Sequence, residues 1–139
     1  MADIFISYSR EDREFARRLA DALEQEGLTT WWDTKILGGR SFRNAIHEEI
    51  DNASVVIVIW SAISIRSRFV VDEAEEALKK QKPLIPVSVD GSEGAIGFRG
   101  FQVVDLTTWY ASGSGPGFKR LMESIHVATG ERIPAADLP

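Results

Sequence analysis

The chain has 139 residues, a length typical of one domain, and its 44% hydrophobic and 27% charged residues are ordinary for a globular protein. The net charge of -5 argues against nucleic-acid binding, and the absence of Cys excludes disulfides, thiolate catalysis and thiolate metal sites. No apolar run approaches the roughly 20 residues of a membrane span, and the N-terminus lacks the layout of a signal peptide. We therefore expect a soluble, cytoplasmic protein with neither a nucleic-acid nor a membrane partner.

Taken in chain order, apolar segments typical of strands alternate with amphipathic segments typical of helices. The expected strands are 4–6, 28–32, 55–60, 84–89 and 101–106. The expected helices are 11–26, a segment marked by Phe42, Ile46 and Ile50, a segment marked by Val70, Ala74, Ala77 and Leu78, and 117–129. We expect the Ser9 side chain to cap the first helix and Gly27 to end it.

Strand–helix alternation of this kind predicts parallel strands joined by right-handed crossovers. The expected fold is α/β, with a five-stranded parallel sheet and helices on both of its faces. Strand 55–60 is apolar throughout, as a central strand between two helix layers must be, whereas Pro83 and Pro86 count against a strand at 84–89 because proline cannot donate to a sheet ladder. Residues 1–130 form the domain, and residues 131–139, which contain two prolines and no periodicity, form a tail or linker.

Several common chemistries of such folds lack their residues in this chain. Ligands bind beside the carboxyl ends of parallel strands, but loop 7–10 has neither a dinucleotide-binding fingerprint nor a P-loop. The third strand ends in Trp60 and Ser61, where a phosphoacceptor domain has Asp, and no G-x-S-x-G elbow is present for a Ser/His/Asp triad. His47 and His126 lie far apart on different predicted helices, so we expect no metal site.

Three short motifs follow one another along the chain. Residues 3–8 read DIFISY, residues 31–33 and 38–42 read WWD and GGRSF, and residues 67–73 read SRFVVDE. In this order they resemble the first strand, the second strand with its BB loop, and the third-helix motif S-x-W-V-x-x-E of TIR domains. The resemblance covers about residues 3–129, is closer to bacterial TIR proteins than to animal receptor adaptors, and implies a flavodoxin-like fold. Phe69 stands where the family usually has Trp.

The resemblance also implies an activity. Enzymatic members of the family hydrolyse or cyclise NAD⁺ with the glutamate that Glu73 matches. They release nicotinamide and form ADP-ribose or a cyclic ADP-ribose isomer, so NAD⁺ is the substrate and no cofactor is needed. The BB loop, here residues 33–41 with Gly38 and Arg40, gates substrate in the family and mediates self-association or contact with other TIR domains, and activity often depends on assembly. Phage defence through NAD⁺ depletion, or signalling by a cyclic product, would fit this family position.

Glu73 admits two interpretations from its helix position. It lies in an acidic run that ends in lysines, which is typical of a solvated helix face. At about 100° per residue, however, Glu73 falls beside Val70 and Ala77 at the edge of the apolar stripe. An acid at that edge is partly desolvated, which favours a raised pKa and a functional role.

The other candidate residues also have a structural alternative. Ser9 and Arg10 follow the first strand at a helix N-terminus, where Arg10 could hold the pyrophosphate of NAD⁺, or could simply be solvated. Phe69 could stack on a base of NAD⁺ or fill the core. Trp32 and Trp60, at strand ends, are the tryptophans that could reach a ligand. For the whole chain, the alternative to an enzyme is an interaction module that works through TIR–TIR contacts without turnover.

Overall fold

The computed structural model describes residues 3–32 and 42–130 and shows a five-stranded parallel sheet in the order β2-β1-β3-β4-β5. The strands are β1 (Ile4–Ser7), β2 (Thr30–Trp31), β3 (Val55–Trp60), β4 (Leu84–Ser88) and β5 (Val104–Asp105). The helices are α1 (Arg13–Gln25), α2 (Phe42–Asn52), α3 (Arg68–Lys79), α4 (Thr107–Ser112) and α5 (Pro116–Thr129). Two 3₁₀ turns, η1 (Arg10–Asp12) and η2 (Ser64–Arg66), follow β1 and β3. The expected α/β architecture is confirmed.

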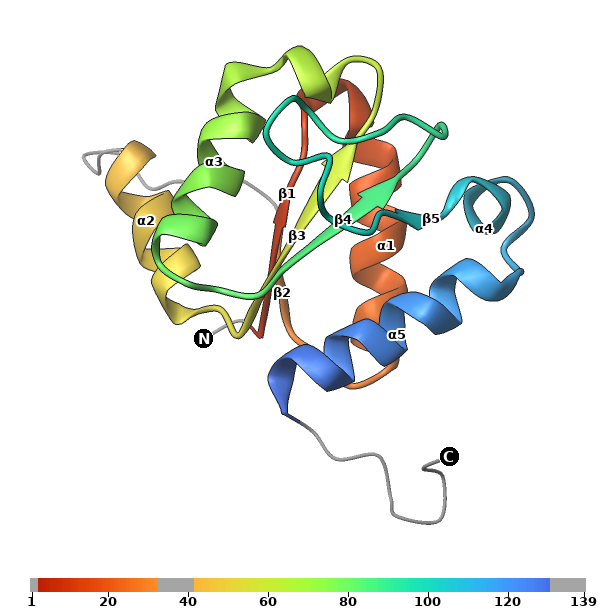
Figure 1. Cartoon of the computed structure of the whole chain (residues 1–139). Coiled ribbons are helices and arrows are strands. Elements are labelled where there is room, and N and C mark those ends of the chain that lie inside the picture. The colour runs from red at the N-terminus through yellow and green to blue at the C-terminus, as the bar shows by residue number, and fades with distance from the viewer. Residues whose placement is uncertain (1–2, 33–41, 131–139) are drawn as a thin grey trace.

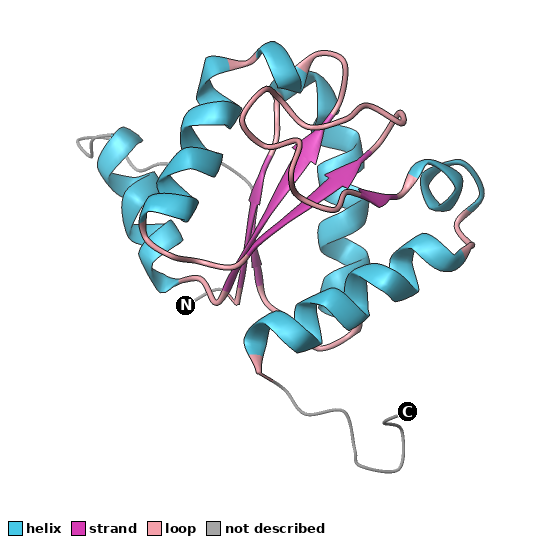
Figure 2. Cartoon of the chain, in the orientation of Figure 1, coloured by secondary structure: helices cyan, strands magenta, loops and turns pink. Residues whose placement is uncertain are grey.

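The helices form a layer on each face of the sheet (Figure 1). α2 and α3 cover one face, and α1 and α5 cover the other. Secondary structure alone shows the same three layers, with the strands enclosed between helices (Figure 2). β3 lies at the centre and is buried along its whole length, as its unbroken apolar sequence predicts.

Side-chain alternation divides β1 between the two layers. Ile4 and Ile6 belong to the large core on the α1 and α5 side, together with Phe15 and Leu19 of α1. Phe5 instead packs with Ile46 and Ile50 of α2 and with Ala77 of α3. Because successive strand residues point to opposite faces, Ser7 shares the face of Phe5. This alternation decides which layer receives the hydroxyl of Ser7.

Strand β4 accommodates Pro86 for a positional reason. Pro86 is opposite Val58 of β3, whereas pairing with β5 begins one residue later, at Val87. Proline cannot donate to a ladder, so it is tolerated where one side of the strand has no partner.

Three details of the sequence prediction were wrong. The first helix begins at Arg13 because η1 precedes it, and β5 is shorter than the expected strand 101–106. Phe101 does not extend that strand because its N–H donates to the carbonyl of Phe98, which turns the chain. Helix α4 was not predicted, since its six residues are too few to show a periodicity.

Among the helices of residues 3–32 and 42–130, none is both long and apolar enough to cross a membrane. The proposed tail 131–139 lies outside the described residues, so its assignment stays a prediction.

Candidate functional site

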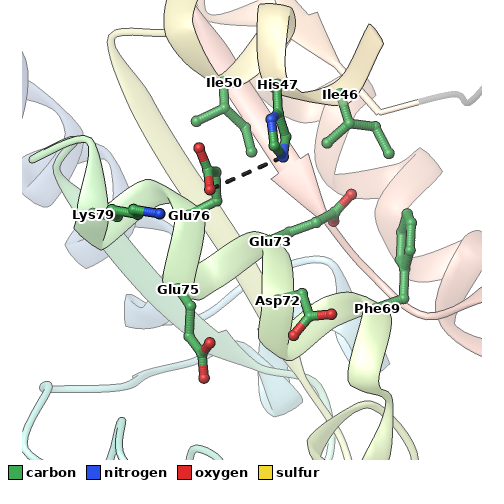
Figure 3. A pocket seen from close by; sticks show the side chains of 9 residues that line it. All are labelled: Ile46, His47, Ile50, Phe69, Asp72, Glu73, Glu75, Glu76 and Lys79. Carbon is green, nitrogen blue, oxygen red and sulfur yellow. Dashed lines mark ion pairs between the residues drawn. The ribbon is translucent and has the colours of Figure 1, made fainter. Parts of the chain in front are cut away.

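Two adjoining cavities lie beside the first turn of α3. The first, here called the α2–α3 cavity, has a volume of about 470 Å³ and is bounded by Ile46, His47, Ile50, Phe69, Asp72, Glu73, Glu75, Glu76 and Lys79 (Figure 3). The second, the strand-end cavity, has about 800 Å³ and is bounded by the segments after β1 and β3: Tyr8, Ser9, Arg10, Glu11, Arg13, Ala62, Ile63, Arg66, Ser67 and Phe69. Phe69 lines both cavities, so they meet at its ring.

Glu73 is the buried acid of the α2–α3 cavity. Its side chain is 6% exposed and points from α3 toward α2, into the space bordered by Ile46 and Phe69 (Figure 3). The neighbouring acids Asp72 and Glu75 are exposed. The interpretation of Glu73 as part of a solvated acidic face is therefore wrong. Its side chain is buried more fully than the partial desolvation expected at the edge of the apolar stripe.

One hydrogen bond holds the carboxyl group of Glu73. The Ser7 hydroxyl, at the end of β1, donates to Glu73 Oε1 over 2.5 Å, and both side chains are buried. Burial raises the pKa of the Glu73 carboxyl from about 4.5 to about 8, and the Ser7 hydrogen bond acts in the opposite direction. Burial is the larger effect, so the protonated form predominates at neutral pH when the cavity holds only water.

Polar contacts connect the two helices that form the walls of this cavity. Lys80, the residue that follows α3, has its Nζ 2.7 Å from Asp51 Oδ1 on α2 and 3.4 Å from Glu76 Oε2 on α3. It also donates to the backbone carbonyl of His47 over 3.3 Å. His47 Nε2 is 4.0 Å from Glu76 Oε1 (Figure 3). Lys80 thus holds α2 and α3 together beside the cavity.

Phe69 lies one helical turn before Glu73 and is 39% exposed. An exposed ring between two cavities is not a core residue, so the core interpretation is wrong. Ser67 caps the helix on which both residues lie, its hydroxyl accepting from the Val70 N–H. This cap fixes the start of α3 and hence the positions of Phe69 and Glu73.

Ser9 and Arg10 both line the strand-end cavity, but Ser9 does not cap a helix with its side chain. In η1, the Asp12 N–H is already bonded to the backbone carbonyl of Ser9. The Ser9 hydroxyl therefore donates to Asp12 Oδ2, which also accepts from the Ser61 hydroxyl. These bonds join the loop after β1 to the loop after β3.

Arg10 is exposed at the rim of the strand-end cavity. Arg13 and Arg66 line the same cavity, with Glu11 as the acid among them. The guanidinium of Arg13 also lies over the ring of Trp32, 5.3 Å from its centre. The structure thus brings further cations to the place where sequence reasoning put Arg10 alone.

Trp60 does not reach a ligand. It is fully buried and packs on Phe98, with ring centres 5.6 Å apart. Gly38, Arg40 and the whole segment 33–41 lie outside the described residues, so their proposed roles stay predictions.

The family model described as "TIR domain" matches residues 4–122. This chain belongs to the TIR domain family. The three motifs that carried the resemblance therefore identified the family correctly, and the flavodoxin-like fold expected for it is confirmed.

Two curated relatives of this TIR domain carry enzyme names. A probable 2' cyclic ADP-D-ribose synthase, TcpO, from Methanobrevibacter olleyae is 35% identical over 69 residues, 48% of this chain and 20% of the relative. The 2' cyclic ADP-D-ribose synthase AbTIR from Acinetobacter baumannii is 31% identical over 91 residues, 61% of this chain and 34% of the relative. The aligned part is thus 20% of the first relative's length and 34% of the second's.

Solved TIR domains share the fold at lower identity. The TIR domain of the Toll-related receptor TRR-2 from Hydra magnipapillata superposes with a TM-score of 0.77 and 21% identity, covering 91% of this chain and 99% of that one. A metazoan TIR-STING receptor from C. gigas gives 0.73 and 21%, covering 90% of this chain and 39% of that one. These likenesses concern the fold alone.

Sequence reasoning missed two residues of the site in this TIR domain. Ser7 could have been found from the alternation of β1, but only with the knowledge that α3 covers the face of Phe5. His47 was considered only as a metal ligand, whereas it lines the cavity of Glu73. Helical spacing from Ile46 and Ile50 places His47 beside the apolar stripe of α2, but no sequence signal places α2 opposite α3.

Proposed function

We propose that this TIR domain cleaves the bond between nicotinamide and ribose in NAD⁺, with Glu73 as the catalytic carboxylate. One observation carries the proposal: a carboxyl group, 6% exposed, lies in a cavity that is open to a ligand. Buried acids are costly, and an acid with a strongly raised pKa beside a cavity is a candidate functional group. The names of the two curated relatives, both 2' cyclic ADP-D-ribose synthases, support the same substrate class.

The chemistry suits a single carboxylate. When the bond from ribose C1′ to the nicotinamide nitrogen breaks, its electron pair stays on the ring, which was cationic and leaves neutral. No general acid is needed, unlike in ordinary glycosidases, which use two carboxyl groups. Positive charge develops on the ribose, and the Glu73 carboxylate stabilises it within a poorly solvated site.

The ribosyl cation is then captured by an oxygen nucleophile. Water gives ADP-ribose and releases one proton, whereas a hydroxyl of the same molecule gives a cyclic ADP-ribose isomer and also releases one proton. Both products leave Glu73 chemically unchanged. The two cavities contain no described feature that selects one nucleophile, so we propose the cleavage step as common to both outcomes.

In this proposal Phe69, Ser9 and Arg10 hold two parts of NAD⁺, the nicotinamide and the pyrophosphate. The exposed ring of Phe69 would stack on the nicotinamide beside Glu73, with less area than the usual Trp offers. The strand-end cavity adjoins it, so Arg10, with Ser9 beside it, would hold the pyrophosphate there. The substrate would then extend across Phe69 from one cavity to the other.

We propose further that assembly activates this site. In this proposal the segment 33–41, with Gly38 and Arg40, completes the substrate site and contacts a second TIR domain. One solved neighbour, 21% identical with a TM-score of 0.57, is described as the TIR domains of the activated Roq1 resistosome.

Incubation of the purified chain with NAD⁺, followed by chromatographic separation of the products, tests the function. We expect nicotinamide together with ADP-ribose or a cyclic isomer, formed faster when the chain is concentrated or clustered on beads. If NAD⁺ stays intact under all of these conditions, the proposal fails, and the chain acts instead as a non-catalytic TIR–TIR interaction module.

The role of Arg10 has its own expected outcome. Arg10→Ala should raise KM for NAD⁺ about tenfold or more while changing kcat little, because a phosphate contact made equally in substrate and transition state affects binding alone. Arg120→Ala removes an exposed arginine of α5 outside both cavities and should leave KM unchanged. An unchanged KM in Arg10→Ala would mean that Arg10 is a solvated surface residue that does not contact NAD⁺.

A further inference from the structure

The contact between Ser7 and Glu73 joins two elements that are distant in sequence. Ser7 is the last residue of β1 and lies opposite Val58 of the central strand, while Glu73 lies on α3, 66 positions away. Ser7 is 1% exposed and Glu73 is 6% exposed, so water competes little for the hydrogen bond between them. The hydrogen bond between the Ser7 hydroxyl and the Glu73 carboxyl group is therefore part of the folded interior and links β1 to α3.

The alternation of β1 explains why the hydroxyl occurs at this position. Phe5, two residues earlier on the same face, packs against the apolar side chains of α2 and α3. Apolar side chains line that face along the sheet, since Val56, Val58 and Trp60 of β3 also point to it. An apolar residue at position 7 would continue the pattern and would leave the Glu73 carboxyl without this donor. Ser7 breaks the apolar pattern at the residue that meets Glu73.

We propose that Ser7 is the positioning residue of this site, its hydroxyl fixing Oε1 of Glu73 so that Oε2 faces the α2–α3 cavity. The inference rests on the proposed function for its catalytic consequence. Among the described residues, Ser7 is the one side chain seen to donate a hydrogen bond to this carboxyl group. The same bond favours the ionised form, which is the form that stabilises a ribosyl cation.

The charged and titratable groups around the cavity do not substitute for Ser7. They are His47 on α2 and Asp72, Glu75, Glu76 and Lys79 on α3. Of these, His47 lies nearest to Glu76, at 4.0 Å, rather than bonded to Glu73. Within the described part of the chain, no hydrogen bond or ion pair is seen between Lys79 and Glu73, and the acids would disfavour ionisation of Glu73. The hydroxyl of Ser7 is therefore the described group seen to promote it.

Three substitutions separate the hydroxyl from the space that it occupies. Ser7→Ala removes the donor. Ser7→Thr and Ser7→Val form a matched pair, because the two side chains have nearly the same shape and differ in the hydroxyl alone. A hydrogen bond to an ionised group shifts its ionisation about tenfold or more. We therefore expect kcat/KM for NAD⁺ at pH 7 to fall about tenfold in Ser7→Ala, and to be about tenfold higher in Ser7→Thr than in Ser7→Val.

A direct titration of Glu73 tests the contact without relying on turnover. The ¹³C signal of its side-chain carboxyl is followed against pH, and its absence in Glu73→Gln assigns it. The midpoint should move to higher pH in Ser7→Ala and Ser7→Val and stay near that of the unaltered chain in Ser7→Thr. Equal midpoints in all four proteins would overturn the proposal. If the midpoints move as expected while no sample consumes NAD⁺, the proposed function fails but Ser7 is confirmed as the group that holds Glu73.

Discussion

At the scale of single residues, the burial of Glu73 makes the stability of the chain depend on pH. The pKa of this carboxyl is about 8 in the folded chain and near 4.5 when exposed, so between these values the folded state binds more protons than the unfolded state. The free energy of unfolding therefore falls as pH rises through this window.

Glu73→Gln should remove this dependence. The glutamine amide is neutral and its oxygen can still accept from Ser7. We expect the variant to match the unaltered chain near pH 4.5 and to be more stable at pH 8 by on the order of 4 kcal/mol, at about 1.36 kcal/mol per pKa unit. Urea unfolding across this pH range measures the difference. Glu75→Gln, an exposed acid of the same helix, is the control and should show no such trend.

The same pKa gives the activity a predicted pH profile. Below pH 8, each unit of pH changes the ionised fraction of Glu73 about tenfold, and kcat/KM reports ionisation of the free enzyme. We expect kcat/KM for NAD⁺ to rise about tenfold from pH 6 to pH 7 and to level off above pH 8. A flat profile over this range would show that cleavage does not need the Glu73 carboxylate.

Helical spacing placed Glu73 beside Val70 and Ala77 at the edge of the apolar stripe, and the structure confirms that its side chain is shielded from water. The sequence could not predict Ser7, whose partner depends on which helix covers β1. The prediction that the Ser9 side chain caps the first helix was wrong. The Asp12 N–H, which the cap would need, is already bonded to the Ser9 backbone carbonyl in the 3₁₀ turn before the helix. Local pattern thus indicated that the Glu73 carboxyl is desolvated, whereas its hydrogen bond to Ser7 depends on the tertiary arrangement.

At the scale of elements, α5 approaches the end of β5 closely at Gly117. A Cβ at this residue would lie 2.4 Å from the backbone carbonyl oxygen of Asp105 and 3.1 Å from Leu106 Cδ2. The carbonyl belongs to β5 and cannot rotate away as a flexible side chain would. The start of α5 therefore depends on the absence of a side chain at Gly117.

Gly117→Ala should destabilise the chain by about 2 kcal/mol, the usual cost of overpacking less the small gain from a stiffer unfolded chain. Gly100→Ala is the matched control, because a Cβ there meets no atom within 4 Å and its φ is not positive. Chemical denaturation of both variants measures the effect. Equal stability of the two would mean that α5 can shift away from β5 at little cost.

Elements with a strong pattern were predictable and weakly patterned ones were not. β3 is apolar along its whole length, so its place between helix layers followed from composition. β5 spans two residues and α4 spans six. Both are too short to show the two-residue repeat of a strand or the 3.6-residue repeat of a helix. Pro86 counted against a strand at 84–89, and its position before the start of β5 pairing explains why β4 tolerates it.

At the scale of the whole molecule, the sheet order brings the site together. β1 lies beside β3 at the centre of the sheet, so the segments that follow them share one edge and form the strand-end cavity. The crossover through α3 then places Glu73 over the end of β1, within hydrogen-bond distance of Ser7. This arrangement is the common α/β solution of a ligand site at the carboxyl ends of parallel strands. The site thus depends on the topology as a whole and on no single motif.

The most direct test of the account is the rate of nicotinamide release from NAD⁺ at pH 8 by three proteins at equal concentration. These are the unaltered chain, Glu73→Gln, and Glu123→Gln, which changes an exposed acid of α5 outside both cavities. We predict equal release by the first and third, and a loss of about 100-fold to 1000-fold in Glu73→Gln, the range for removing one group that stabilises transition-state charge. Release by folded Glu73→Gln at the rate of the unaltered chain would contradict the account.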